Sequence, residues 1–222
     1  IHPETSTLGN IAHMKGQLQR LGISYAWERE LEDLSTSDSQ PIHPRRALRD
    51  LAQAMPEDAI VATDIGNVCS TANAYLRFEE PRQFLAAMTF GNCGYAYPAA
   101  LGAQLAAPDR PVVAFVGDGA WGMSLHETMT AVEEGLPVVA AVFNNGQWGA
   151  EKRNQIDFYG SRFVATDIGR TIGGFNFCAI AQAMGAVGVR VEKPDEVGPA
   201  LRDSLSSRRP TVLEIMVDAA EL

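Results

Sequence analysis

Cysteines, basic residues and long apolar runs are all scarce in this sequence, and each shortage excludes a class of protein. The three cysteines, Cys69, Cys93 and Cys178, include no Cys-x-x-Cys pair, which argues against a disulfide framework or a zinc site and favours a reducing cytoplasm. Eighteen basic residues stand against 27 acidic ones, giving a net charge of -9 that argues against nucleic acid as the main partner. No apolar run approaches the roughly 18 residues that span a bilayer, and no signal peptide is visible, so we expect no membrane partner.

The remaining composition is that of a globular protein, with one stretch set apart. The chain has 222 residues, of which 46% are hydrophobic and 20% charged. Residues 11–34 have a helix-like pattern, and the polar run 35–40 that follows is typical of a linker. We therefore interpret residues 1–40 as a linker or tail from a preceding domain, and residues 41–222 as the folded domain. Because the chain starts at Ile1 rather than Met, we expect it to be a piece of something longer.

From residue 41 onward, apolar strands alternate with helices. We predict strands over residues 59–63, 111–116, 138–143, 187–191 and 211–217, and helices over 45–55, 67–76, 120–134, 179–184 and 196–205, with one more that ends at Ala107. The strands are apolar on both faces, which predicts a three-layer α/β/α fold with a mostly parallel central sheet. Ligands bind such sheets at the carboxyl ends of the strands, so the informative residues should follow Thr63, Val116 and Phe143.

A glycine-rich turn over residues 117–122 follows one of these strands. It fits the dinucleotide pattern G-x-G-x-x-G, but it contains Asp118, and a carboxylate beside a pyrophosphate is repulsive unless a divalent cation lies between them. The next strand ends in Asn144-Asn145-Gly146-Gln147, whose oxygens suit Mg²⁺, rather than in the acidic residue that a nicotinamide site needs. We therefore expect Asp118 and Asn145 to face one cation. A metal-free nicotinamide oxidoreductase is the alternative from another class, and a turn without any ligand is the simplest one.

The combination of Gly117-Asp118-Gly119, a spacer of 24 residues and Asn144-Asn145 resembles the signature of thiamine-diphosphate (ThDP) enzymes. The resemblance implies that Asp118, Asn145 and Gln147 hold Mg²⁺ against the cofactor. It also implies that the backbone amides of Gly119 and Ala120 contact its diphosphate.

Two further segments resemble parts of the same family. Gly66 and Asn67 fall on a second diphosphate loop, and the segment Gly91-Asn92-Cys93 falls on the support for the bent cofactor, where Cys93 would be an apolar wedge. Asn67 as a helix cap and Cys93 as a core residue are the alternatives. Lys152 and Arg153 are either contacts for an anionic substrate or solvated helix charges, and His43 is expected outside the site. The expected cofactor-binding residues are thus Gly66, Asn67, Gly91, Asn92, Cys93, Gly117, Asp118, Gly119, Ala120, Asn145, Gln147, Trp148 and Gly149.

Within the family, residues 90–98, 117–123 and 147–155 are similar to the sulfoacetaldehyde acetyltransferases of the acetolactate-synthase-like branch. The resemblance implies an acyltransferase that converts sulfoacetaldehyde and phosphate to acetyl phosphate and sulfite. It further implies an activating Glu on a pyrimidine-binding domain of the same or another chain, in a homodimer or homotetramer. We therefore expect these 222 residues alone to be inactive or nearly so. Acetolactate synthase, another ThDP-dependent carboligase or decarboxylase, and a non-catalytic subunit that only dimerises are the alternatives.

Overall fold

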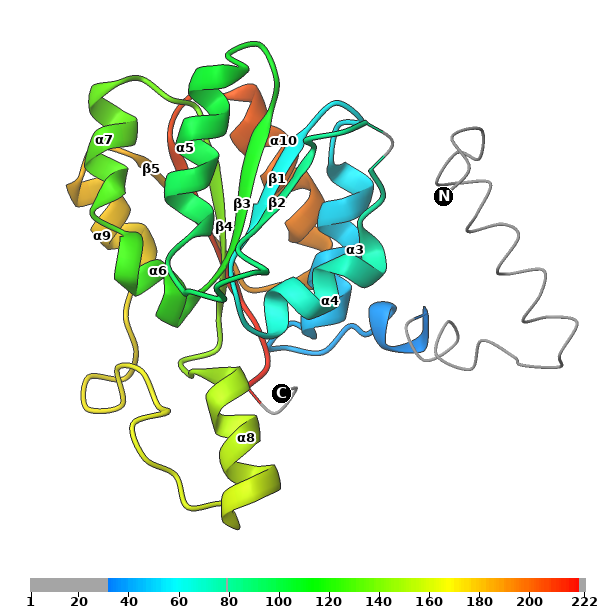
Figure 1. The fold of residues 1–222 in the computed structure, drawn as a ribbon, viewed down its shortest axis with the longest axis vertical. Helices are drawn as coiled ribbons and strands as arrows, with labels where there is room; N and C mark the ends of the chain where they lie inside the picture. Colours follow the sequence, from blue (N-terminus) through cyan, green and yellow to red (C-terminus); the bar gives the residue numbers. More distant parts are fainter. Residues whose placement is uncertain (1–31, 79, 220–222) are drawn as a thin grey trace, which may run out of the picture. The chain divides into compact units, whose positions relative to one another are not determined.

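The computed structural model describes residues 32–78 and 80–219, of which those from Leu34 onward form one compact unit. The helix expected over 11–34 falls almost entirely outside the described residues. Within the compact unit, a central sheet lies between two layers of helices (Figure 1). The expected three-layer α/β/α fold is therefore confirmed.

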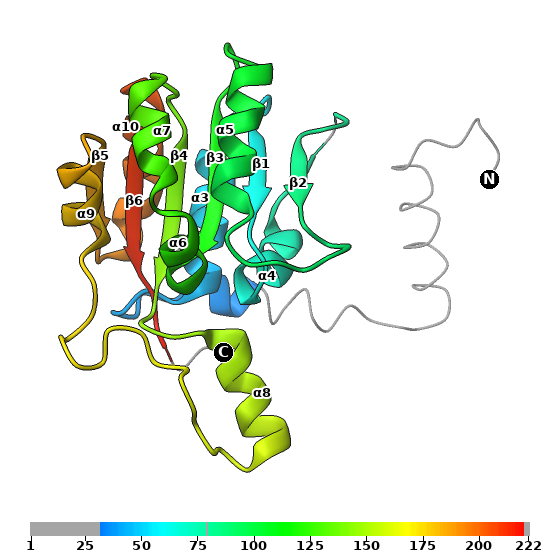
Figure 2. The same ribbon diagram turned by 60° about the vertical axis from the view of Figure 1, so that its left-hand side comes forward.

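The sheet has six strands in the order β2-β1-β3-β4-β6-β5, and every neighbouring pair is parallel (Figure 2). The strands are β1 (Ile60–Thr63), β2 (Phe84–Ala86), β3 (Val112–Gly117), β4 (Val139–Asn144), β5 (Val187–Val191) and β6 (Thr211–Met216). All carboxyl ends therefore lie along one edge of the sheet, from which the segments leading into α4, α6 and α8 emerge.

Alternate residues of the central strands point to opposite faces, and each face has its own apolar core. On β3, Val113 and Phe115 pack into one core, whereas Val112, Ala114 and Val116 pack into the other. The first core is covered by α3 (Pro44–Ala54), α4 (Asn67–Tyr75) and α10 (Val197–Ser206), which follows the short 3₁₀ helix η1 (Pro194–Glu196). The second is covered by α5 (Ala96–Ala106), α6 (Asp118–Ser124), α7 (Glu127–Glu133) and α9 (Phe177–Ala183). Burial on both faces explains why these strands are continuously apolar in sequence.

Three differences from the sequence expectations stand out. The edge strand β2 and the helix α8 (Gly149–Tyr159) were not among the predicted elements, and the single helix expected over 120–134 is divided into α6 and α7 by Leu125 and His126. Both residues keep right-handed helical backbone angles, and the amide of Thr128 donates to the carbonyl of Leu125, which tightens the turn. The helical spacing of apolar residues therefore continues across the break, so the sequence pattern does not reveal it.

Helix α8 (Gly149–Tyr159) extends past the carboxyl ends of the strands and buries none of its side chains (Figure 1). In the described part of the chain, no helix is long and apolar enough to cross a membrane.

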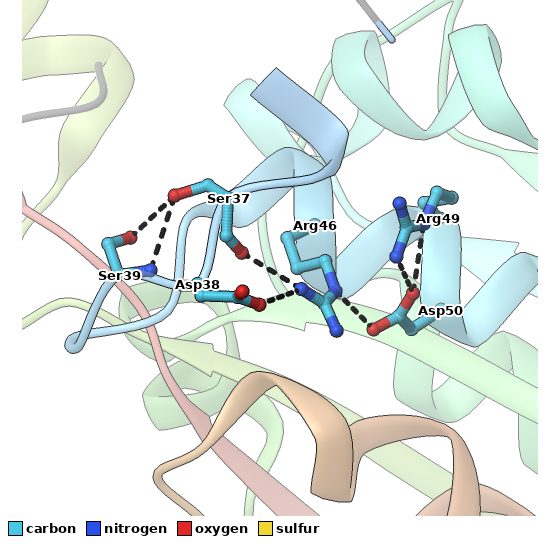
Figure 3. Close-up of polar contacts among 6 residues, drawn as sticks. All are labelled: Ser37, Asp38, Ser39, Arg46, Arg49 and Asp50. Carbon is cyan, nitrogen blue, oxygen red and sulfur yellow. Dashed lines mark hydrogen bonds and ion pairs between the residues drawn. The ribbon is translucent and has the colours of Figure 1, made fainter. Parts of the chain in front are cut away.

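A group of ion pairs attaches residues 37–38 to helix α3 (Figure 3). The Arg46 guanidinium donates to the Ser37 carbonyl at 3.0 Å, to the Asp38 carboxylate at 2.6 Å and to the Asp50 carboxylate at 2.7 Å. Close by, Ile42 pairs with Val217 just beyond the end of β6. These contacts fix the start of α3, which lies at the same edge of the sheet as the residues described next.

Candidate functional site

The turn from β3 into α6 carries the carboxylate of Asp118, which is only 2% exposed. Its Oδ1 accepts the amide N–H of Gly119 at 2.9 Å, and its Oδ2 accepts that of Gly146 at 2.6 Å. Burial raises the pKa of Asp118 to about 6, although these backbone N–H groups act to lower it. Among the described residues, no cationic side chain donates a hydrogen bond to this carboxylate. A bound cation would therefore offset the free-energy cost of burying its charge.

The loop after β4 lies against this carboxylate. Gly146 adopts φ of +69°, which glycine tolerates, and the turn directs its amide to Asp118. Asn145 Oδ1 accepts the amide of Gln147 at 3.1 Å, while the amide of Trp148 donates to the carbonyl of Thr166 at 2.8 Å. The loops after two neighbouring strands therefore meet, as the parallel sheet requires.

These loops form one wall of a cavity of about 290 Å³, near the lower end of the roughly 300–1,000 Å³ that small-ligand sites occupy. Most of the expected cofactor-binding residues line it, namely Gly66, Asn67, Cys93, Gly117, Asp118, Gly119, Ala120, Asn145, Gln147, Trp148 and Gly149. Gly91 and Asn92 are not among the lining residues and are exposed. The structure thus brings together residues from four segments that are far apart in the sequence.

The expectation that His43 lies outside the site is wrong, because His43 lines the cavity together with Arg45. His43 caps the N-terminus of α3 by accepting the amide of Arg45 on Nδ1 at 3.1 Å. The rule that ligands bind after the strands of such a sheet does not extend to the start of α3. The pairing of Ile42 with Val217 carries that helix start to the cavity.

The oxygen donors at the cavity fit a magnesium ion bound together with a phosphate group. Gln147 Oε1 is buried and has no hydrogen-bond partner among the described residues, which leaves it able to bind a ligand. Asp118 and Asn145 offer further oxygens beside it. In the described chain, no three His, Cys, Asp or Glu side chains gather as a metal-binding group. With one carboxylate, the protein ligands suit Mg²⁺ that completes its shell with water and phosphate oxygens.

The turn after β1 is held by a second buried carboxylate, that of Asp64. It accepts the amides of Ile65 at 3.0 Å, Gly94 at 2.9 Å and Ala96 at 2.9 Å, which ties the start of α5 to the end of β1. Burial raises the pKa of Asp64. Gly66 is the N-cap residue just before α4 and has φ of +123°, a backbone conformation that residues with a side chain rarely adopt.

Cys93 lines the cavity and is half-buried. Its thiol pKa is raised by burial and, to a smaller extent, by the negative charges of Asp64 and Glu151. The thiol therefore stays protonated near neutral pH and behaves as a small apolar group rather than a nucleophile.

Both basic residues at the start of α8 are engaged in ion pairs. Lys152 Nζ lies 2.8 Å from the Asp167 carboxylate and over the ring of Phe163, and Arg153 lies 2.8 Å from Asp157. These pairs favour a structural role over contact with an anionic substrate.

Sequence reasoning missed Glu214, which is fully buried on β6. Its Oε1 accepts the Asn144 Nδ2 amide at 2.7 Å, and its Oε2 lies 3.6 Å from Arg190. The sequence did contain a sign of this residue, since Glu214 is a single charge in an otherwise apolar strand. A buried charge needs hydrogen-bond or ionic partners, so it marks a polar contact inside the fold.

Comparison with known proteins identifies the class to which this fold and site belong. Residues 64–215 match the family described as "Thiamine pyrophosphate enzyme, C-terminal TPP binding domain", and the chain belongs to that family. The chain is also 51% identical over 210 residues to the sulfoacetaldehyde acetyltransferase of Castellaniella defragrans, covering 86% of this chain and 34% of that protein. With the sulfoacetaldehyde acetyltransferase of Alcaligenes xylosoxydans xylosoxydans it shares 54% identity over 179 residues, covering 79% and 29%. The chain thus spans about a third of the length of these relatives.

A solved structure shows the same fold. The thiamine diphosphate-dependent 4-hydroxybenzoylformate decarboxylase of Rhodococcus jostii RHA1 superposes with a TM-score of 0.75 at 25% identity, covering 84% of this chain and 34% of that one. Membership of this family excludes the alternative of a nicotinamide-dependent oxidoreductase.

Proposed function

We propose that this chain binds the diphosphate of ThDP through Mg²⁺ held by Asp118, Asn145 and Gln147. The observation that carries the proposal is the buried Asp118 carboxylate, which accepts the amide of Gly146 from the loop after β4. Gln147 of the same loop lines the cavity with it, and its buried Oε1 has no hydrogen-bond partner among the described residues. The turn from β1 into α4, with Gly66 and Asn67, lines the same cavity. The thirteen residues expected from the sequence remain the proposed cofactor contacts.

We further propose that the whole enzyme is a sulfoacetaldehyde acetyltransferase that forms acetyl phosphate and sulfite from sulfoacetaldehyde and phosphate. Identity of 51–54% to proteins of that name supports this over acetolactate synthase. The activating Glu, contributed by a pyrimidine-binding domain of the same or another chain, and assembly as a homodimer or homotetramer belong to the same proposal.

ThDP, when bound, supplies the nucleophilic carbon at which bonds to the substrate carbonyl are made and broken. The residues of this chain hold and orient its diphosphate end. Asp118 provides the negative charge that retains the cation, and the neutral Cys93 contributes an apolar wall that excludes water. Arg45 brings a positive charge to the cavity wall, where anionic groups of ligands would be received.

The test uses the full-length enzyme and compares Asp118→Ala with Asp109→Asn, which changes an exposed carboxylate in the turn before β3. We expect Asp118→Ala to abolish Mg²⁺-dependent ThDP binding in calorimetry and Asp109→Asn to preserve it. Assays with sulfoacetaldehyde plus phosphate, and separately with pyruvate, then decide the substrate. Undiminished cofactor binding by Asp118→Ala would refute the metal site, and turnover of pyruvate alone would refute the acetyltransferase.

A further inference from the structure

The buried carboxylate of Glu214 contacts Asn144, at the start of the loop over residues 144–147 (the metal loop), and does not line the cavity. It comes from the middle of β6, where Leu213 and Ile215 face one core and the Glu214 side chain points to the other side of the sheet, toward α9. Since an apolar residue at such a position is often as stable as a buried ion pair, stability alone does not account for a charge here.

Glu214 controls the orientation of Asn144 at the end of β4. A carboxylate only accepts hydrogen bonds, so the Asn144 side chain must turn its Nδ2 toward Glu214, at 2.7 Å. The Asn144 Oδ1 is thereby directed away, and it accepts the amide of Gly146 at 3.2 Å. The same Gly146 amide donates to Asp118 Oδ2 at 2.6 Å. A continuous series of hydrogen bonds thus connects Glu214 with the proposed metal ligand.

Three other donors hold Glu214 itself in place. The amides of Phe177 and Cys178, in the first turn of α9, approach its two oxygens at 3.4 Å and 3.3 Å, and the Arg190 guanidinium on β5 lies at 3.6 Å. The side chain of Arg190 is 36% exposed and also pairs with Glu192 at 2.8 Å. The carboxylate is therefore fixed by α9 and β5 and can in turn fix Asn144.

From this geometry, and resting on the metal site proposed above, we propose that Glu214 is a positioning residue for the metal loop over residues 144–147. It touches neither cofactor nor metal. It orients Asn144, which sets the Gly146 amide and hence the Asp118 carboxylate in the arrangement that receives the cation. A glutamine at this position can accept from Asn144 but presents its own NH₂ to donors on the other side, so it satisfies only part of the network.

The experiment compares Glu214→Gln with two controls in the full-length enzyme. Glu192→Gln makes the same chemical change at the exposed carboxylate that pairs with the same Arg190. Leu201→Ala removes a buried side chain from α10, on the opposite face of the sheet, and lowers stability without touching the network.

The first measurement is the apparent dissociation constant of Mg²⁺ at saturating ThDP. We expect Glu214→Gln to raise it about 10-fold or more, the effect typical of residues that orient metal ligands, with kcat restored as Mg²⁺ becomes saturating. Both controls should retain the wild-type constant. A purely structural role would make Glu214→Gln resemble Leu201→Ala, and that result overturns the proposal.

The second measurement needs neither metal nor cofactor. Hydrogen exchange of the Gly146 amide in the apo enzyme should accelerate in Glu214→Gln and stay unchanged in Glu192→Gln and Leu201→Ala. Wild-type exchange in Glu214→Gln would overturn the positioning role even if the proposed function holds. If instead wild-type enzyme shows no Mg²⁺-dependent ThDP binding, the proposed function fails while the exchange result still decides the role of Glu214.

If Glu214→Gln does not fold, Asn144→Ala replaces it, because that variant removes the connecting amide and leaves Glu214 with its α9 and Arg190 partners. The same weakening of Mg²⁺ binding and the same faster exchange of Gly146 are expected. Wild-type values in Asn144→Ala would contradict the proposal equally.

Discussion

Replacing Gly119 with alanine tests how closely the Trp148 ring packs on helix α6. An added Cβ would lie 2.8 Å from three ring atoms of Trp148, well inside the roughly 3.5–4.0 Å at which carbon atoms pack. The ring cannot retreat with its backbone, since the Trp148 amide donates to the Thr166 carbonyl at 2.8 Å and its own carbonyl accepts the amide of Lys152 at 2.9 Å. We therefore expect the indole to swing away from α6 and to loosen the cavity wall.

The magnitude follows from two opposing effects. Overpacking costs about 1–3 kcal/mol, whereas alanine in place of a helical glycine gains roughly 0.5–1 kcal/mol. Gly122→Ala lies one turn further along α6 and has open space around its added Cβ, so it receives the stabilisation from alanine without the cost of overpacking. The free energies of unfolding of the two variants, from urea denaturation, should thus differ by about 1–3 kcal/mol, and only Gly119→Ala should weaken ThDP binding. Equal stabilisation by both substitutions would refute the proposed packing.

Three further predictions concern the scaffold. Gly188→Ala would place a Cβ 2.6 Å from the backbone oxygen of Cys178, so we expect it to cost about 3 kcal/mol or more in urea denaturation, whereas Gly102→Ala, which has open space, should cost nothing. Burial raises the pKa of Tyr97 to about 12, so the folded chain keeps a proton that the unfolded chain loses near pH 10. The contribution of Tyr97 to stability should be complete below about pH 10 and be lost as the pH rises to about 12. Tyr97→Phe should therefore lose less stability than the wild type over this range, and the remaining slope comes in part from Cys178, whose thiol pKa burial also raises to about 12. Asp64→Asn turns an NH₂ group toward one of the three backbone amides that donate to Asp64, and it should lower the free energy of unfolding by about 1–3 kcal/mol. Wild-type stability in this variant would contradict a stabilising role for these three hydrogen bonds.

The fold could be predicted because its strands are buried on both faces. Continuous apolar runs such as 112–116 and 139–143 mark central parallel strands, and the residues after them are brought together by the sheet itself. The proximity of Asp118 to the Asn145 loop was therefore predictable from strand order alone.

The sequence was less informative where packing between distant segments decides the structure. Strand β2 has only three half-buried residues, too few to show a pattern. The contribution of His43 depends on Ile42 pairing with Val217, near the opposite end of the described chain, and no local signal records that pairing. Glu214 was detectable as a charge in an apolar strand, but its partner Asn144 was not, because their side chains meet only through the register of β4 with β6.

The pairing of Ile42 with Val217 also has a consequence for how such a domain can be assembled into larger proteins. Ile42 and Val217, near the two described ends of the compact unit, lie side by side, and His43 and Val217 both line the cavity. Because these two segments meet beyond the end of β6, the domain can be joined to other modules at both of them without a connection that crosses its sheet.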